Sequence, residues 1–396
     1  MGWPRTVTVT VGGVDHTGEA IDSVYLQRGR RSYWEGMPAG LGRIILSDPA
    51  VRPAVNELCT VDVALQSGTA RVFQGRVQAV SAQYDPNVGA LITLDVFGPL
   101  ARAGRRDQEA TLPQQLDGAR VLAVLEDALG QQWAEQPLTQ QWGQVPASLT
   151  WADYGADASL IDAGLYTVAA LTQVPTSTFG ALAAAAFSGG GVVYETGDGR
   201  IGYADSTRRQ GASLGTPVTI DASVIAARSG SATARRDDIV NQVILTWSGG
   251  TAIYNATDSI AEYGFTTREY TSILDDANDA DDLAERLAQL QAFPQADLDG
   301  PFLVRLNNTT DSLTDQLLQL EINDYISVTN VPTSVLPAGT FYGFVEGLNI
   351  EVTDVAANVE VFASDERFSI YNTRWADVPD NLTWGDTNAT LQWQNA

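Results

Sequence analysis

Short segments in which apolar and polar residues alternate fill the first hundred residues of the chain. Residues 6–11 read Thr-Val-Thr-Val-Thr-Val and run into a Gly12-Gly13 turn, which is typical of a strand with one buried face. Further strand patterns follow at the spacing of a small barrel, at 23–28, 40–46, 61–65, 71–80 and 90–97. We therefore expect a first β-barrel over residues 1–103.

After this region the apolar residues recur with helical spacing. Residues 118–129 place apolar side chains on one helical face, and residues 178–187 predict a second helix that ends at a run of glycines. A hairpin is predicted at 192–203, because Asp198-Gly199 is a strong turn signal between two strands. These elements predict a small α+β domain over residues 104–232.

The rest of the chain mixes the two patterns. A helical pattern at 279–293 stands between strand patterns at 239–247, 325–329, 341–350 and 358–364. We expect a second β-barrel over 233–370, interrupted at about 255–320 by an α/β insertion, a subdomain with both strands and helices. Residues 371–396 are expected to leave this barrel as an arm. The predicted fold is mainly β with α+β parts.

Two of the predicted strands share one local pattern. Residues 73–80 read Phe-Gln-Gly-Arg-Val-Gln-Ala-Val, and residues 341–348 read Phe-Tyr-Gly-Phe-Val-Glu-Gly-Leu. Matched flanking strands favour two copies of one small barrel over a chance recurrence. A subunit with two similar barrels can build a near-sixfold ring from three copies. We therefore predict a role in subunit contacts for the shared residues Phe73, Gly75, Val77, Phe341, Gly343 and Val345.

The net charge of the chain limits the kinds of partner that it can bind. The net charge is −25, and all 23 basic residues are arginines. Binding of nucleic acid through its phosphates needs a basic face, so the charge argues against it. An acidic surface is compatible with DNA that slides past without sticking, and equally with solubility alone. The use of Arg without Lys suggests a genome rich in G and C.

Six of the nine tryptophans stand in two sets with a spacing of nine residues. A tryptophan buries much area and still offers one N–H donor, so such sets suit the docking of a segment or of another chain. Stacking on sugar rings is an alternative, and packing in the core of each domain is another. The predicted docking residues are Trp133, Trp142, Trp151, Trp375, Trp384 and Trp393.

Residues suited to catalysis or to metal binding are scarce. The chain has one cysteine, Cys59, and one histidine, His16, so an internal disulfide, a zinc site and a histidine-based nucleophile are not expected. The acidic run 275–282 lacks the glycine and the last glutamate of a calcium loop, and it precedes a helix that it can cap. We expect no cofactor, no metal, no signal peptide and no membrane insertion.

The order of these parts resembles the tail hub (baseplate hub) proteins of long-tailed phages, including minor tail proteins of phages that infect actinobacteria. The resembling segments are residues 7–13, Gly29-Arg30, 40–46, 73–77, 198–203, 260–264 and 341–348. In that family two similar barrels per subunit form a trimeric, pseudo-sixfold ring that joins the tail tube to the tail tip around the DNA channel. The resemblance implies a structural virion protein rather than an enzyme.

The resemblance also implies partners and a location. The expected partners are two further copies of the chain, the tail tube or distal tail protein, the tape measure protein and other minor tail or fibre proteins. DNA would pass through the ring without specific binding. The protein would be made in the host cytoplasm and end in the tail tip of the virion. Two rival hypotheses stay open: a carbohydrate-binding, receptor-recognising tail-tip protein, and a glycoside hydrolase, whose paired carboxylates sequence spacing does not reveal.

Overall fold

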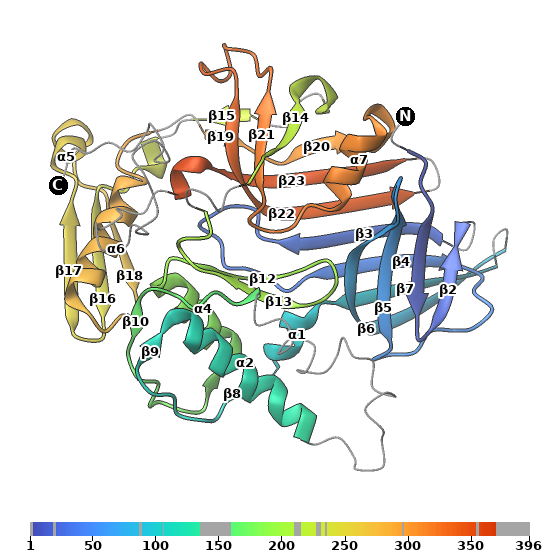
Figure 1. Cartoon of the computed structure of the whole chain (residues 1–396), viewed down its shortest axis with the longest axis horizontal. Coiled ribbons are helices and arrows are strands. Elements are labelled where there is room, and N and C mark those ends of the chain that lie inside the picture. Colours follow the sequence, from blue (N-terminus) through green and yellow to red (C-terminus); the bar gives the residue numbers. More distant parts are fainter. Residues whose placement is uncertain are drawn as a thin grey trace.

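The computed structural model describes residues 3–18, 21–86, 89–105, 107–134, 160–209, 215–226, 231–233, 236–294, 297–353 and 356–369. Figure 1 shows a large sheet, a region with helices α2 and α4 below it, and a smaller sheet with helix α6 at its side. A mainly β fold with α+β parts is thus confirmed.

Within the described residues the large sheet has twelve strands, in the order β14-β21-β22-β3-β4-β7-β6-β5-β1-β2, while β23 pairs with β22 and β20. Seven of its strands come from the first hundred residues: β1 (Val7–Val11), β2 (Val14–Thr17), β3 (Ile21–Gly29), β4 (Leu41–Ser47), β5 (Leu58–Ala64), β6 (Thr69–Asp85) and β7 (Gly89–Phe97). The others are β14 (Val218–Asp221), β20 (Phe302–Arg305), β21 (Tyr325–Thr329), β22 (Phe341–Thr353) and β23 (Ala357–Asp365).

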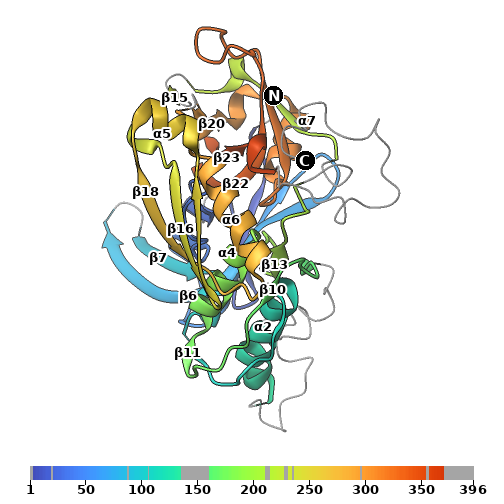
Figure 2. The ribbon, with the colours of Figure 1, turned by 90° about the vertical axis from the view of Figure 1, so that its left-hand side faces the viewer.

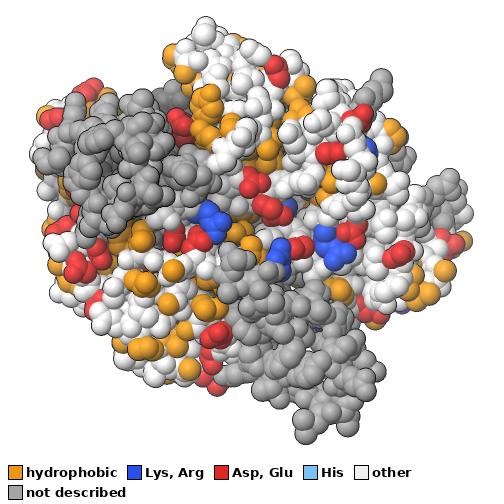
Figure 3. Space-filling model, viewed as in Figure 1, with side chains coloured by type: hydrophobic (Ala, Val, Ile, Leu, Met, Phe, Trp, Pro, Cys, Tyr) orange, Lys and Arg blue, Asp and Glu red, His pale blue; other side chains and the backbone are white. Residues whose placement is uncertain are grey.

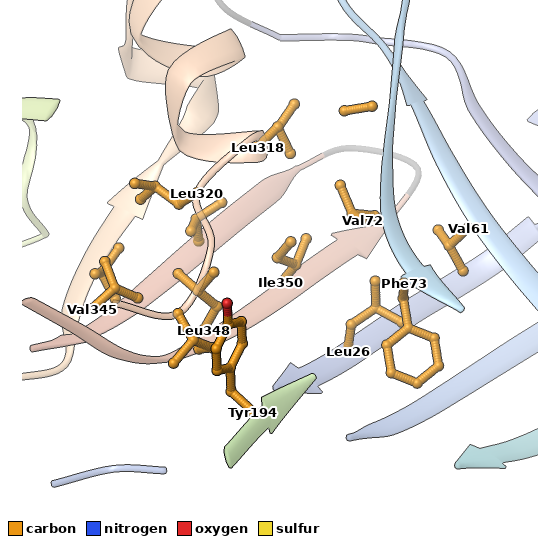
Figure 4. Close-up of a cluster of buried hydrophobic side chains, with 14 of the residues drawn as sticks. Leu26, Val61, Val72, Phe73, Tyr194, Leu318, Leu320, Val345, Leu348 and Ile350 are labelled. Atoms are coloured by element: carbon orange, nitrogen blue, oxygen red, sulfur yellow. The ribbon is translucent and has the colours of Figure 1, made fainter. Parts of the chain in front are cut away.

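Strand β3 joins the strands of the two expected barrels. It pairs with β4 along one edge and with the second half of β22 along the other. The division into two barrels therefore stays a prediction, since the hydrogen-bonded ladder runs through both sets of strands. One apolar core also serves both: Figure 4 shows Val72 and Leu26 of the first set beside Leu348 and Ile350 of the second.

The region at 99–204 contains the predicted helices and hairpin. Helix α4 begins where Ser177 accepts a hydrogen bond from the Gly180 N–H, and it ends before Gly189. The elements are α1 (Pro99–Ala103), β8 (Asp107–Gln108), β9 (Gln115–Leu116), α2 (Asp117–Ala134), β10 (Thr167–Val168), β11 (Thr176–Ser177), α4 (Thr178–Ser188), β12 (Val192–Glu195) and β13 (Ile201–Ala204).

A separate three-stranded sheet has its own core beneath helix α6, in which Leu283 and Leu287 pack on Val243 and Leu245. Its elements are β16 (Gln242–Trp247), β17 (Gly250–Asn255), α5 (Thr257–Tyr263), β18 (Thr267–Thr271) and α6 (Ala277–Gln289). Helix α6 begins at the predicted acidic run, where Asp276 accepts from the Asn278 and Asp279 N–H groups.

The division between the small and the large sheet does not follow the range 255–320, and the insertion itself stays a prediction. Strand β16, expected in the second barrel, belongs to the small sheet, whereas β20 lies within 255–320 but pairs with β23 of the large sheet. Alternation of side chains identifies a strand but not the sheet that it joins. The remaining elements of the described residues are β15 (Ser231–Thr233), β19 (Asp297–Asp299), α7 (Asp311–Leu318) and 3₁₀ turns at Ala222–Val224, Arg236–Asp238, Leu306–Asn308 and Glu366–Ser369.

Cys59 and His16 are both buried in strands of the large sheet, β5 and β2. In the described part of the chain no group of three potential ligands is arranged to hold a metal ion. None of the described helices has both the length and the apolar character needed to cross a bilayer.

Candidate assembly interface

The two copies of the repeated motif occupy the same place in two equivalent sets of strands. Phe73 on β6 lies opposite Val61, and Phe341 on β22 lies opposite Val328. Four residues later each strand carries a bulge against its other neighbour, after Val77 in β6 and after Val345 in β22. The two motifs therefore agree in register on both edges, and not only in residue type.

The agreement extends to a further strand. On the far side of β7, Ile44 of β4 lies opposite Leu94, and on the far side of β23, Phe302 of β20 lies opposite Val361. Leu94 and Val361 stand at the same position relative to the two bulges, so β4 and β20 are equivalent strands. We call the set β4-β7-β6-β5 the first repeat and the set β20-β23-β22-β21 the second repeat.

The turns that enter β5 and β21 match as well, although they lie outside the shared motif. Asn56 and Asn323 both have a left-handed backbone, with φ of 71° and 75°. The Asn56 N–H donates to the Val77 carbonyl at 2.7 Å, and the Asn323 N–H donates to the Val345 carbonyl at 2.8 Å. Because this geometry is shared, the similarity of the repeats is structural and not a chance match of letters.

Each motif glycine permits a close approach of two strands. A Cβ atom on Gly75 would lie 2.4 Å from the Phe97 carbonyl oxygen, and one on Gly343 would lie 2.2 Å from the Ser364 carbonyl oxygen. Both obstacles are backbone atoms, which cannot rotate away. The glycines thus set the strand spacing at the bulges.

The predicted interface residues have buried side chains within the chain itself. Phe73, Val77, Phe341 and Val345 belong to the common core, so a role in contacts between subunits stays a prediction. Of the predicted docking tryptophans, Trp133 lies on the last turn of α2. The others lie outside the described residues, namely Trp142, Trp151, Trp375, Trp384 and Trp393.

A buried carboxylate lies where β22 meets the end of β3. Glu346 follows the bulge valine of β22, and its side chain is fully buried. It accepts hydrogen bonds from Arg30 Nε and Arg209 Nη1, each at 2.6 Å, and from the Ser364 hydroxyl. Arg209 also lies over the Phe344 ring. This group of Glu346, Arg30 and Arg209, which we call the junction triad, links the end of β3 to β22.

The charges around Glu346 determine its ionisation. Burial by itself would raise its pKa, but the positive charges and hydrogen bonds of Arg209 and Arg30 outweigh burial and hold the pKa at about 2. The carboxylate is therefore ionised at neutral pH. Two arginines for one carboxylate leave the triad with a net positive charge, although the chain as a whole is strongly acidic.

A second buried carboxylate fixes the hairpin β12–β13 to the first repeat. Glu195 accepts from the Gly40 N–H at 2.8 Å and from the Leu100 N–H at 2.5 Å. Burial raises its pKa to about 7, against the effect of these two donors and of Arg28. Its two oxygens are occupied by backbone donors, so its geometry is that of a structural carboxylate rather than of a catalytic acid.

Sequence reasoning did not single out these two carboxylates. The available signal for Glu346 was a charge within the apolar run Phe344-Val-Glu-Gly-Leu348, at the position where the first repeat has Gln78. Arg30 stands in the sequence only as part of a Gly-Arg pair, which carries no signal for an ion pair. The distance in sequence between Arg30, Arg209 and Glu346 hides the triad until the chain is folded.

Figure 3 shows that the visible basic side chains on this face lie close to acidic ones. A hollow of about 580 Å³ is lined by Arg71, Arg200 and Arg208 among others. Each of these arginines pairs with an aspartate: Arg71 with Asp62, Arg200 with Asp198 and Arg208 with Asp162. This paired arrangement does not give the basic face that phosphate binding requires.

No model of a known protein family matches the sequence, and no curated protein matches it either. Two solved structures share its fold over nearly the whole chain. The first is the 43 kDa tail protein of prophage MuSo2 from Shewanella oneidensis, with a TM-score of 0.57 and 12% identity over 92% of this chain and 99% of that chain. The second is the tail protein from Neisseria meningitidis MC58, with a TM-score of 0.59 and 12% identity over 93% of this chain and 98% of that one. The chain thus has the fold of phage tail proteins.

Proposed function

We propose that the protein is a structural component of a phage tail, a hub or minor tail protein of a long-tailed phage of an actinobacterial host. Three copies would form a pseudo-sixfold ring that joins the tail tube to the tail tip. The observation that carries the proposal is the pair of repeats with matching registers in a chain with the fold of tail proteins. Three copies of two repeats give six similar positions around an axis.

The charge suits a ring around DNA. A net charge of −25 per chain repels the phosphates, so DNA can pass without binding to the wall. The pairing of the arginines in the 580 Å³ hollow supports the same view. Partners along the axis would be the tail tube or distal tail protein on one side and the tape measure protein and other minor tail or fibre proteins on the other.

The copy number in assembled particles tests the ring. We expect three copies per virion when peptides of the protein are quantified by mass spectrometry against isotope-labelled standards and the packaged genome. The major tail tube protein, counted in the same sample, is the control and should give a multiple of six. A count of six or of one, or absence of the protein from purified particles, would contradict the proposal.

We also propose that residues 371–396 form an arm whose tryptophans dock on a neighbouring subunit or on another tail protein. Three indoles that dock can anchor an arm that is otherwise polar, because each buried aromatic contributes about 2–3 kcal/mol. Truncation after Arg374 is expected to leave a folded protein whose tails lack the next component, as seen by electron microscopy and infectivity. Normal infectious tails made with the truncated protein would refute docking by the arm.

A further inference from the structure

The two repeats differ in what covers one edge. In the second repeat, Gly347–Thr353 of β22 pair with Ser23–Gly29 of β3. The equivalent half of β6, beyond the bulge after Val77, pairs along residues 79–84 with β7 only, as far as the described residues extend. Backbone donors and acceptors on the outer edge of this segment are therefore open to a further strand. We call residues 79–84 the open edge.

Side chains on the open edge keep an apolar alternation, although two of the three apolar ones are exposed. In β22, Leu348, Ile350 and Val352 are only 2%, 2% and 6% exposed. Their counterparts in β6, counted from the bulge, are Val80, Ala82 and Tyr84. Val80 is half-buried, Ala82 is exposed and Tyr84 is 77% exposed. Figure 2 shows this end of the β6–β7 hairpin standing out from the body of the molecule.

A counterpart of β3, which lies beside the first repeat, lies beside the second repeat. In the first repeat Gln27 of β3 lies opposite Leu41, and Ile21 lies opposite Leu46 after a shift of one residue in the register. In the second repeat Ser231 of β15 lies opposite Asp299, and Ile225 bridges to Val304. Leu41 and Asp299 stand three residues before Ile44 and Phe302, and Leu46 and Val304 stand two residues after them. The two strands therefore have equivalent partners, and the register shifts by one residue in both cases.

Strand β15 thus lies beside the second repeat in the place that β3 has beside the first. Strand β3 has partners on both edges, β4 and β22. Strand β15 pairs with β19 and with no other strand among the described residues. Each chain consequently has an open edge on β6. It also has a strand, β15, whose counterpart β3 covers the equivalent edge of β22.

We propose that β15 of one copy of the chain pairs antiparallel with the open edge of a second copy. The register is the one that β3 uses on β22: Thr233 opposite Ala79, Ala232 opposite Val80 and Ser231 opposite Ser81. Strand addition of this kind joins chains through main-chain hydrogen bonds, while alternate side chains provide specificity. The inference rests on the proposed ring, for which it supplies the contact between subunits.

One chain cannot make this contact with itself. Figure 1 places β15 at the top of the molecule and the β6–β7 hairpin at its side, well apart. A contact between two different surfaces is heterologous, and it closes into a ring when the rotation per copy allows. Around the ring, β3–β22 pairing within a chain would then alternate with β15–β6 pairing between chains. All strand pairings between neighbouring repeats would be similar.

Paired cysteines test the register. Within the chain the Arg30 N–H donates to the Glu346 carbonyl, so the next pair, Gly29 and Gly347, lies at a non-hydrogen-bonded site. The corresponding pairs between copies are Thr233 with Ala79 and Ser231 with Ser81. At such sites the Cα atoms are about 4.5 Å apart, within the range that a disulfide spans. The native Cys59 is buried, which raises its pKa to about 12 and keeps it unreactive.

Four double variants of the full chain use the same four substitutions. The matched variants are A79C with T233C and S81C with S231C, and the mismatched controls are A79C with S231C and S81C with T233C. After mild oxidation of assembled tails and of concentrated purified protein, we expect covalent dimers and trimers on non-reducing gels from both matched variants. The mismatched controls are expected to give at least tenfold less. Mapping of the disulfide by mass spectrometry identifies the joined peptides.

The outcomes separate this contact from the ring itself. No disulfide from either matched variant, or equal yields from matched and mismatched variants, overturns the proposed contact. If three copies per virion are nevertheless counted for the unmodified protein, the ring stands and is built through another surface. If the count is not three, the proposed ring is wrong whatever the cross-linking shows.

Discussion

Replacement of Glu346 by glutamine is expected to lower the free energy of unfolding by about 3–5 kcal/mol, because it leaves two buried arginines without their shared carboxylate. Arg30 and Arg209 each lie 2.6 Å from Glu346 and are themselves largely buried. Denaturant unfolding followed by tryptophan fluorescence measures the change. The control is Glu351→Gln on the same strand, since the Glu351 side chain is exposed and a surface change should alter stability by less than about 0.5 kcal/mol.

The pH dependence of the Glu346→Gln effect follows from the sign of the pKa shift. The folded pKa of Glu346, about 2, lies below the ordinary value of 4.5. Its contribution to stability is thus complete above the unfolded pKa and is lost as pH falls through the folded one. The difference in unfolding free energy between the native protein and the variant should shrink as the pH is lowered from about 4.5 to about 2. A difference that is constant or grows in this interval would show that the triad is not ionised.

Replacement of Gly343 or Gly75 by alanine is expected to destabilise the fold by about 3 kcal/mol at each site, the upper end of the usual cost of overpacking. The added methyl group would lie 2.2 Å from the Ser364 carbonyl oxygen or 2.4 Å from the Phe97 carbonyl oxygen, so two paired strands must move apart. The effect on each repeat is measured separately by hydrogen exchange on β22–β23 and β6–β7.

Gly36→Ala is the matched control for the glycine variants. A Cβ atom there would have no neighbour within 4 Å, and the backbone of Gly36 is not left-handed. This variant should unfold within about 0.5 kcal/mol of the native protein. If Gly75→Ala and Gly343→Ala prove as mild as the control, the motif glycines do not set the strand spacing, and the motif loses its physical explanation.

Much of the local structure could be predicted from the sequence, because it depends on neighbouring residues. Alternation at 6–11 and 61–65 gives β1 and β5, and the helical pattern at 178–187 with the glycines that follow it gives α4. The repeated motif was visible because Phe, Gly and Val hold the same spacing at 73–77 and 341–345. These features have a period or a turn chemistry that can be read along the chain.

Only the tertiary structure determined how these elements are joined. Backbone hydrogen-bonding groups are the same in every strand, so no residue pattern shows which strands pair. The sequence therefore does not show that β3 pairs with β22, that β16 belongs to the small sheet, or that β15 corresponds to β3. The junction triad has the same origin, since Arg30, Arg209 and Glu346 meet only after the sheet has formed. The sequence by itself indicated many of the strands, and it showed that two of them share one motif. The edges at which they pair, and the charges enclosed there, were decided by packing between residues far apart in the chain.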